Sequence, residues 1–372
     1  MKNKVVGIMM AVCMTAALLS GCGSGSASSS GSAQSSSGEE KTEAAAESTQ
    51  PAADAIQMRI CYTNADNTQQ GMNMIFFEEK VEELTGGRVD VVRFPNASLG
   101  TTADEVNMVL NGACEATYTF AGTAESTIPL EGYVMSPFLF TVYPGDTSLE
   151  RAVFEDQQVH DIMEAAAEAQ GLKRFGIIPT GLGSFLIANN TKEIAKPEDA
   201  AGMKIRSAGS EGSNIMLEAC GASPTSIAAS ELAVALQQGV VDGLTTSLTY
   251  YHEANLHTKY VTMPYANGST TPFYVSLKWW NDLPEDLQDI IENQAVPAMF
   301  DYACECLEKT ETEYYEAIQN EPYNVKVTVM DVSSIKDQCI ETGIQKLEEK
   351  AGPDARTVIE RVIEIKGELG IE

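Results

Sequence analysis

Short apolar runs that are typical of β-strands alternate with amphipathic helical patterns along most of this chain, and this alternation limits the possible folds more than any other feature. The run 57–62 is strand-like, and the stretch 71–84 that follows places apolar residues at spacings of three and four. Further segments of the same kind are strand-like runs at 88–94, 116–120, 172–178, 184–188, 203–206 and 240–243 and helical runs at 104–110, 196–199 and 230–238. We therefore predict an α/β protein with mostly parallel strands.

A long helical pattern begins at Leu283 and Pro284 and continues to about Asn320. At 1.5 Å per residue it measures roughly 50 Å. Pro297 lies inside the pattern, and a proline bends a helix because it removes one backbone donor and clashes with the preceding turn. A chain of 372 residues is long enough for two lobes, and a helix of this length exceeds one small lobe, so we expect it to run along both.

The N-terminal segment has the layout of an export signal. Lys2 and Lys4 supply positive charge, residues 5–19 are almost wholly apolar, and small residues follow. The apolar run is shorter than the roughly 20 residues that span a bilayer as a helix, so a permanent transmembrane helix is the weaker interpretation.

The run Leu19-Ser20-Gly21-Cys22 resembles a bacterial lipobox, in which the cysteine thiol is joined to diacylglycerol and cleavage makes that cysteine the first residue. The alternative is a chance cysteine near an ordinary cleavage site. Residues 23 to about 55 are rich in Ser, Gly, Ala and Glu without an apolar period, which is typical of a disordered tether. We therefore predict a lipoprotein signal peptide at 1–21, an anchor and tether at 22–56, and a folded part from 57 to 372 that is held at the extracytoplasmic face of the cell membrane.

The formal net charge of −29 excludes some partners. Nucleic acid and anionic membrane surfaces would repel such a chain, so we expect no nucleic-acid partner and contact with a membrane through the lipid only. An anion-binding site in this chain has to be made positive locally.

Six cysteines remain outside the signal and the anchor, and their spacing matches no zinc motif; they are Cys61, Cys114, Cys220, Cys304, Cys306 and Cys339. Free buried thiols are the interpretation we favour, although an oxidising exterior permits disulfides, and the pairing stays open. The three histidines do not form a metal-ligand set either, and the sequence predicts no cofactor. Gly181-Leu182-Gly183-Ser184 lacks the glycine that a nucleophile elbow needs after its serine, so we predict no enzyme.

Several stretches, taken in order and spacing, resemble the extracytoplasmic solute receptors of the tripartite ATP-independent periplasmic (TRAP) transporters. The resemblance covers residues from about 57 to about 325. Its stretches are TGGRV at 85–89, FPN at 94–96, LG at 99–100, PFLF at 137–140, PEDAAGMKIR at 197–206, GASPT at 221–225, and Glu231 with ALQ at 235–237, Gly239 and VDG at 241–243.

This resemblance implies a periplasmic-binding-protein-like fold with two α/β lobes, a long helix across both, and ligand closed between them. We place lobe I at about 57–180 and 271–305, and lobe II at about 181–270 and 306–372. The resemblance also implies a small organic acid as ligand, TRAP membrane subunits as partners, ion-driven uptake and no catalysis, and we expect a monomer. An ABC-type solute-binding lipoprotein and a ligand-sensing receptor subunit remain alternatives.

Arg206 matches the arginine that commonly pairs with the ligand carboxylate in these receptors. It ends an apolar strand, where open α/β folds place their ligands, and its planar guanidinium can make two parallel bonds to one carboxylate. A surface arginine paired with an acid is the alternative. The other candidate ligand contacts, each with capping or packing as its alternative, are Asn64, Asp104, Phe120, Phe185, Thr246, Tyr250 and Thr271.

Three positions depart from the family pattern. Phe185 stands where some members carry a second arginine, and Gly122 and Ala229 stand where some relatives have larger contact residues. These changes favour a ligand with one carboxylate and an apolar or aromatic body. Trp279 and Trp280 precede the long helix, so we expect them to pack rather than to stack on a sugar.

Overall fold

The computed structural model describes residues 54–140, 143–181, 185–207, 210–227, 231–266 and 268–371. The predicted lipid anchor at Cys22, the predicted strand start at Ser184 and the predicted helix start at Ser230 lie outside these residues, as does Ala229. The side chain of Phe185 is also outside the description.

Lobe I is built on a five-stranded sheet with the order β2-β1-β3-β10-β4. β1 runs parallel to β2 and β3, whereas β10 is antiparallel to β3 and β4. The strands are β1 Ile56–Cys61, β2 Val89–Phe94, β3 Ala116–Tyr118, β4 Leu172–Gly181 and β10 Ser269–Ser276.

Helices cover both faces of this sheet. α1 begins after Thr68, whose side chain accepts from the Gly71 amide, and it ends at Gly86 in the left-handed conformation with a φ of 63°. Its apolar residues Phe77 and Val81 are fully buried against the sheet. The helices of this lobe are α1 Gln69–Thr85, η1 Thr102–Asp104, α2 Glu105–Leu110, α3 Ala121–Ala124, η2 Pro129–Met135, α4 Ser148–Glu155, α5 Gln157–Glu168 and α9 Leu277–Asp282.

Lobe II is built on a six-stranded sheet with the order β11-β9-β5-β8-β6-β7. β6 is parallel to β7 and β8, and β9 is parallel to β11, whereas β5 is antiparallel to both of its neighbours. Its elements are β5 Phe185–Asn189, η3 Pro197–Ala200, β6 Lys204–Ser207, α6 Glu211–Ala219, β7 Ser223–Ser226, α7 Leu232–Gln237, β8 Gly243–Ser247, α8 Leu248–Glu253, β9 Tyr260–Met263 and β11 Lys326–Val329.

The mostly parallel pairing that we predicted holds only in part. Each sheet contains an antiparallel portion, made by β10 and β4 in lobe I and by β5 in lobe II. These strands adjoin two of the segments by which the chain passes between the lobes, from β4 to β5 and from β9 to β10. The parallel portions, β2-β1-β3 and β8-β6-β7, keep the strand–helix alternation that the sequence displays.

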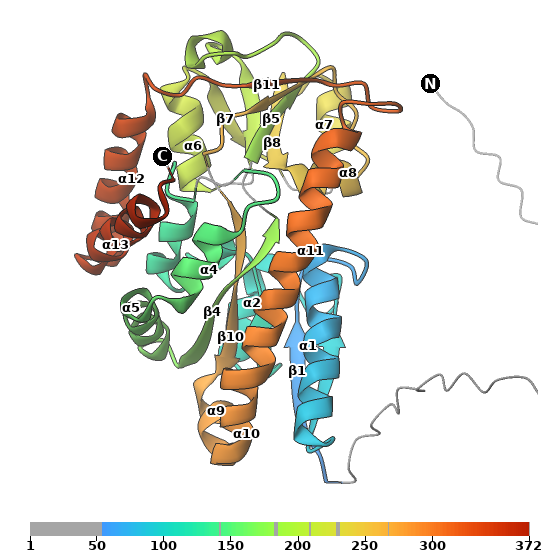
Figure 1. The fold of residues 1–372 in the computed structure, drawn as a ribbon, viewed down its shortest axis with the longest axis vertical. Coiled ribbons are helices and arrows are strands. Elements are labelled where there is room, and N and C mark those ends of the chain that lie inside the picture. Colours follow the sequence, from blue (N-terminus) through green and yellow to red (C-terminus); the bar gives the residue numbers. More distant parts are fainter. Residues whose placement is uncertain are drawn as a thin grey trace, which may run out of the picture. The chain divides into compact units, whose positions relative to one another are not determined.

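The predicted long helix is present and runs without interruption from Glu285 to Ala317 as α10 Glu285–Ile290, the π-helical turn η5 Ile291–Ala295 and α11 Val296–Ala317. Pro297 lies in the first turn of α11, directly after this π-helical turn. Figure 1 shows the helix passing both sheets, and α11 contacts α1 and β4 in lobe I and α8 in lobe II. Trp280 is buried in the lobe I core, and Trp279 packs against that core, as predicted.

Two C-terminal helices, α12 Lys336–Ala351 and α13 Asp354–Leu369, follow β11. α12 packs against α6 of lobe II and η2 of lobe I, whereas α13 packs against α4 and α5 of lobe I. The prediction assigns 306–372 to lobe II, whereas α13 packs on lobe I and α12 contacts both lobes. In the part of the chain that the structure describes, no helix combines the length and the apolar character needed to cross a membrane.

Candidate functional site

Arg206 lies near the carboxyl end of β6, between the parallel strands β7 and β8. Its register partners are Thr225 on β7 and Leu244 on β8. Open α/β sheets bind ligands beyond the carboxyl ends of their parallel strands, so the fold delivers this side chain to the expected edge of lobe II.

The guanidinium of Arg206 is buried and is held by two backbone carbonyl groups. Nε donates to the Ile227 oxygen at 2.7 Å, and Nη1 donates to the Thr245 oxygen at 3.0 Å. Nη2 donates to none of the described residues. Burial lowers the pKa of Arg206 to about 10, and the phenol of Tyr250 lies close enough to act on that pKa in the opposite direction.

No carboxylate among the described residues forms an ion pair with Arg206, and a second buried arginine shows the contrast. Arg174 on β4 is 3% exposed, and its Nε donates to Oε1 of Glu131, which is fully buried, at 2.5 Å. Tyr274 donates to the same Glu131 oxygen at 2.5 Å. Arg174 therefore has a complete structural role, whereas Arg206 keeps a buried charge that no acid among the described residues balances.

Thr246 and Tyr250 lie beside Arg206. Thr246 is two residues beyond Leu244, which is the register partner of Arg206, so it shares the sheet face of the arginine. It is 5% exposed, and its hydroxyl bonds to none of the described residues. Tyr250 lies in the first turn of α8, where its amide donates to the cap residue Ser247, and its ring is half-buried.

Two candidates come from the carboxyl ends of the parallel strands of lobe I. Asn64 follows β1 and is half-buried. Its backbone N–H donates to Gln70 Oε1 at 2.9 Å, and its side-chain amide bonds to no described residue. Phe120 follows β3, precedes α3 as its cap residue and is half-buried. The structure therefore brings both residues to the same edge of the sheet.

Asp104 caps a helix at the place where we predicted a ligand contact. It is exposed, and its Oδ2 accepts from the amide and the hydroxyl of Thr101, at 3.2 and 2.6 Å. The neighbouring Glu105 points inward instead: it is fully buried, and its Oε1 accepts from the Thr63 hydroxyl at 2.9 Å. Its second oxygen and the Thr119 hydroxyl are buried without a hydrogen-bond partner in the described residues. Burial raises the pKa of Glu105 to about 7.

The sequence analysis did not single out Glu105, although the sequence contains a signal for its inward position. The pattern Thr101-x-x-Asp104 is a capping arrangement, and it turns the carboxylate of Asp104 back to the chain. The next residue then begins the face of α2 that packs toward the sheet, together with Val106 and Val109.

The two remaining candidates lie near the segments between the lobes. Thr271 on β10 is fully buried, and its hydroxyl is 2.8 Å from the Thr180 hydroxyl on β4, so it joins two strands of lobe I. The backbone of Phe185 opens β5 and pairs with Ser247.

The two edges approach one another at α3 and α6. A Cβ atom added at Gly122 would be 4.0 Å from the Cβ atom of Ser210, the cap residue of α6. Lys350 of α12 contacts Glu125 of lobe I at 3.1 Å and also contacts Glu211 of lobe II. The region after β3 in lobe I therefore faces the region after β6 in lobe II.

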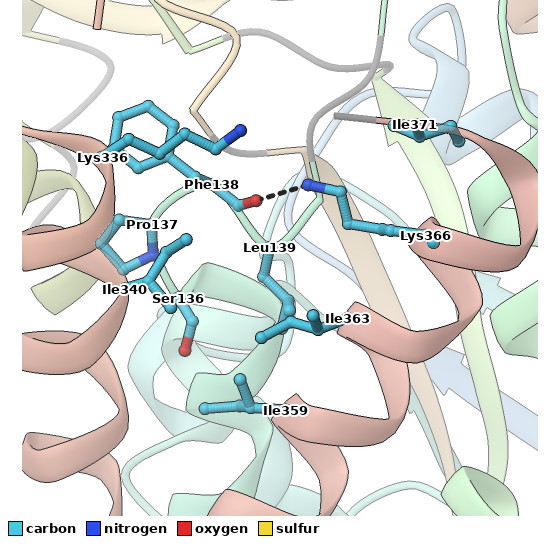
Figure 2. A pocket seen from close by; sticks show the side chains of 11 residues that line it. Ser136, Pro137, Phe138, Leu139, Lys336, Ile340, Ile359, Ile363, Lys366 and Ile371 are labelled. Atoms are coloured by element: carbon cyan, nitrogen blue, oxygen red, sulfur yellow. Dashed lines mark hydrogen bonds between the residues drawn. The ribbon is translucent and has the colours of Figure 1, made fainter. Parts of the chain in front are cut away.

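Two cavities lie near the ends of these helices. One, of about 680 Å³, is between the lobes, and residues from α3, α6 and α12 line it, including Gly122 and Asn214. The other, of about 250 Å³, is more apolar and lies between the segment 136–139 and the helices α12 and α13. Figure 2 shows Lys366 reaching the Phe138 carbonyl in this cavity, at 2.8 Å. None of the candidate ligand contacts lines either cavity. We assign the site to the interlobe region because the residues that follow β3 in lobe I face those that follow β6 in lobe II.

Comparison with known proteins agrees with this geometry. A family model described as bacterial extracellular solute-binding protein, family 7, matches residues 60–350. A solute-binding protein of Verminephrobacter eiseniae is 31% identical over 192 residues, which are 52% of this chain and 55% of that protein. The chain thus spans about half the length of the curated relatives that it matches at this level.

Solved structures establish the fold. A TRAP periplasmic solute-binding protein from Ochrobactrum anthropi has a TM-score of 0.75 and 24% identity, covering 84% of this chain and 97% of that one. Another, from Desulfovibrio salexigens with bound orotic acid, has a TM-score of 0.74 and 21% identity, covering 84% and 99%. These likenesses confirm the predicted two-lobed fold. Because the family model covers well over half of its length, the chain belongs to the bacterial extracellular solute-binding proteins of family 7.

Proposed function

We propose that this protein captures a small organic anion between its two lobes and delivers it to the membrane subunits of a TRAP transporter for ion-driven uptake. The ligand carboxylate lies on Arg206, and the residues at the carboxyl ends of β1, β3 and β8 surround the rest of the molecule. The protein acts outside the cytoplasm, held at the membrane by a lipid on Cys22.

One observation carries the proposal: Arg206 is a buried charge that has no acid partner among the described residues. A chain with 53 Asp and Glu residues has ample acids for a structural ion pair, as Arg174 and Glu131 demonstrate. A guanidinium held only by carbonyl groups is therefore positioned for a carboxylate that arrives with the ligand. The single hydrogen of Nε is already donated to Ile227, so Nη2, which is free of described partners, and the second hydrogen of Nη1 are the donors that the planar fork offers to a ligand carboxylate.

The surroundings of Arg206 favour one carboxylate on an apolar or aromatic body. Phe120 supplies an apolar wall, and Gly122 leaves space that a side chain would fill. Thr246, Tyr250 and the Thr119 hydroxyl offer a small number of hydrogen bonds. Solved structures of similar likeness hold orotic acid, succinate and glucuronate, so they support an organic acid as the ligand, and the preference for an apolar body rests on the residues named above.

The two alternatives keep the same site and differ in the partner. An ABC-type receptor or a sensing subunit would also close on an anion at Arg206. The membership in family 7 favours TRAP subunits, and the genes beside this one are the direct test of the partner.

A thermal-shift screen of organic acids on the full chain tests the ligand class. An acid at 100 times its dissociation constant adds about 2.7 kcal/mol to the free energy of unfolding. We expect flat monocarboxylates to raise the melting temperature more than sugar acids with many hydroxyl groups. Shifts only with neutral sugars or peptides would contradict the anion assignment, and shifts only with sugar acids would contradict the apolar body.

A further inference from the structure

Two cysteines of lobe I lie with their sulfur atoms in contact. Cys61 is the last residue of β1, and Cys114 lies two residues before β3. The two cysteines are 53 positions apart in the sequence. Their Sγ atoms are 3.3 Å apart, and the side chains are 2% and 0% exposed. No other pair of cysteine sulfurs within the described ranges is in such contact.

The backbone already holds the two residues side by side. β1 and β3 are parallel neighbours with Cys61 opposite Thr117, and the Glu115 amide donates to the Arg59 oxygen at 3.0 Å. The Glu115 carboxylate also accepts from the amide and the side chain of Arg59. A disulfide needs a sulfur–sulfur distance of about 2.05 Å, so side-chain rotation over a little more than ~1 Å brings the atoms together.

We propose that Cys61 and Cys114 form a disulfide by exchange with a small-molecule disulfide such as oxidised glutathione. The family is extracellular, and an oxidising exterior keeps such bonds. The bond ties the end of β1 to the turn that precedes β3. Thr63, whose hydroxyl donates to Glu105, is only two residues beyond Cys61. The disulfide therefore also restrains the residues that follow β1 at the carboxyl edge of the lobe I sheet.

The exchange proceeds in two balanced steps. The Cys114 thiolate attacks one sulfur of the small disulfide, which releases one small thiolate and leaves a mixed disulfide. Cys61 then loses its proton and attacks the Cys114 sulfur, releasing the second small thiolate. Two protein thiols are oxidised, and one small disulfide is reduced to two thiols.

The order of attack follows from the two thiols. The hydrogen bond from Cys61 lowers the pKa of Cys114, with Arg59 acting in the same direction, whereas the contact with Cys114 and burial raise the pKa of Cys61. Cys114 also adjoins the exposed turn 111–113, which opens more easily than β1. Reaction takes place while this turn is open, during folding or local opening, and closure then buries the bond.

Mass spectrometry of the full chain is the direct test. The protein is incubated with oxidised glutathione under mildly denaturing conditions, returned to native buffer, alkylated after full denaturation, and digested with and without reduction. We expect one cross-linked peptide pair that contains Cys61 and Cys114, with Cys220 and Cys339 alkylated in both samples. Full alkylation of Cys61 and Cys114 without reduction would overturn the proposal.

A melting comparison provides the second readout. Dithiothreitol should lower the melting temperature of the oxidised protein by roughly 5 °C, because the bond shortens the free loop of the unfolded chain. The double variant Cys61→Ser/Cys114→Ser should lose this response, and the matched control Cys220→Ser should keep it. A response that persists in the double variant would place the stabilising bond elsewhere, and the mass measurement on the unaltered chain decides the question if the variant does not fold.

Discussion

Replacing Arg206 by alanine should nearly abolish ligand binding while the protein stays folded. In the closed cleft the ligand carboxylate would lose its counter-charge and its bonds to the guanidinium together. Truncating one partner of a buried charge pair costs about 2–5 kcal/mol. At 1.4 kcal/mol per decade, the dissociation constant should rise by roughly 30- to 3,000-fold.

The stability of the free protein should respond much less than binding does. Burial lowers the pKa of Arg206 from its ordinary value to about 10, which means that its buried charge is about 3 kcal/mol less favourable than in water. Removing the side chain removes this cost, and it also removes two hydrogen bonds of about 1 kcal/mol each. These effects oppose one another, so the free energy of unfolding should change by no more than about 2 kcal/mol.

Arg174→Ala is the matched control, because it removes the other buried arginine. That substitution leaves Glu131 buried with an unbalanced charge, which costs about 3–5 kcal/mol of stability. Arg206→Lys should recover part of the affinity, since an ammonium keeps the charge but not the planar fork.

Calorimetric titration with the acid found by the screen measures binding, and melting curves of the free variants measure stability. Near-native affinity in a well-folded Arg206→Ala protein would remove Arg206 from the site. A loss of stability as large as that of Arg174→Ala would show that Arg206 has a structural role instead.

The further predictions concern the anchor, the lobes and two buried titratable groups. Cys22→Ser should move the protein from the membrane fraction to the soluble fraction, and equal membrane retention of the two forms would place the anchor elsewhere. Small-angle scattering should show a smaller radius of gyration at saturating ligand, because the lobes close on it. Lys350→Met removes a half-exposed ion pair between the lobes, and such pairs contribute at most about 1 kcal/mol. The substitution should therefore weaken ligand binding no more than about fivefold, and a larger loss would contradict this. Burial raises the pKa of Glu150 to about 8, so its contribution to stability is complete below about 4.5 and is lost as pH rises through about 8. Glu150→Gln should therefore flatten the decline in melting temperature between about pH 4.5 and pH 8, and an unchanged decline would contradict this. Burial lowers the pKa of Lys366 from 10.5 to about 8, which has the opposite sign, so Lys366→Met should remove a rise in stability between these values, and an unchanged slope would refute this.

The sequence predicted the strand–helix order well because each segment carries its own period and its own stop signals. The expected helix at 71–84 is α1 Gln69–Thr85, and the expected strand at 88–94 is β2 Val89–Phe94. Gly86 ends α1 because only a residue that tolerates a positive φ fits there. These signals are local, so a single sequence reveals them.

Features that depend on distant contacts could not be predicted. The strand expected at 240–243 begins only at Gly243, because Asp242 forms a turn that bonds to Lys204 through its amide and its carboxylate. The position of α13 against lobe I depends on packing with α4 and α5, which no local pattern displays. The contact between Cys61 and Cys114 likewise follows from the parallel register of β1 and β3.

The candidate site was predicted unevenly for the same physical reason. Arg206, Thr246 and Phe120 lie close to strand ends, and strand ends can be found in a sequence because the apolar run stops there. Asp104 and Glu105 are neighbours at the start of a helix, and a shift of one position along a helix changes an outward-pointing side chain into an inward-pointing one. Deciding which of the two side chains points inward requires knowledge of the capping hydrogen bonds, and a pattern of apolar residues does not reveal them.

In the proposed function, neither the net charge of −29 nor the buried charge of Arg206 distinguishes one organic acid from another. At physiological salt the Debye length is about 8 Å, so the acidic surface repels anions weakly beyond that distance and does not guide them into the cleft. Arg206 acts at contact distance, where water is excluded and screening is weak. Every carboxylate that enters must give up its own hydration, and Arg206 offsets that cost equally for all acids of similar size. In the proposed site, the difference between one acid and another therefore comes from the part of the ligand that does not touch Arg206, and we expect Phe120, Tyr250 and the space beside Gly122 to determine specificity.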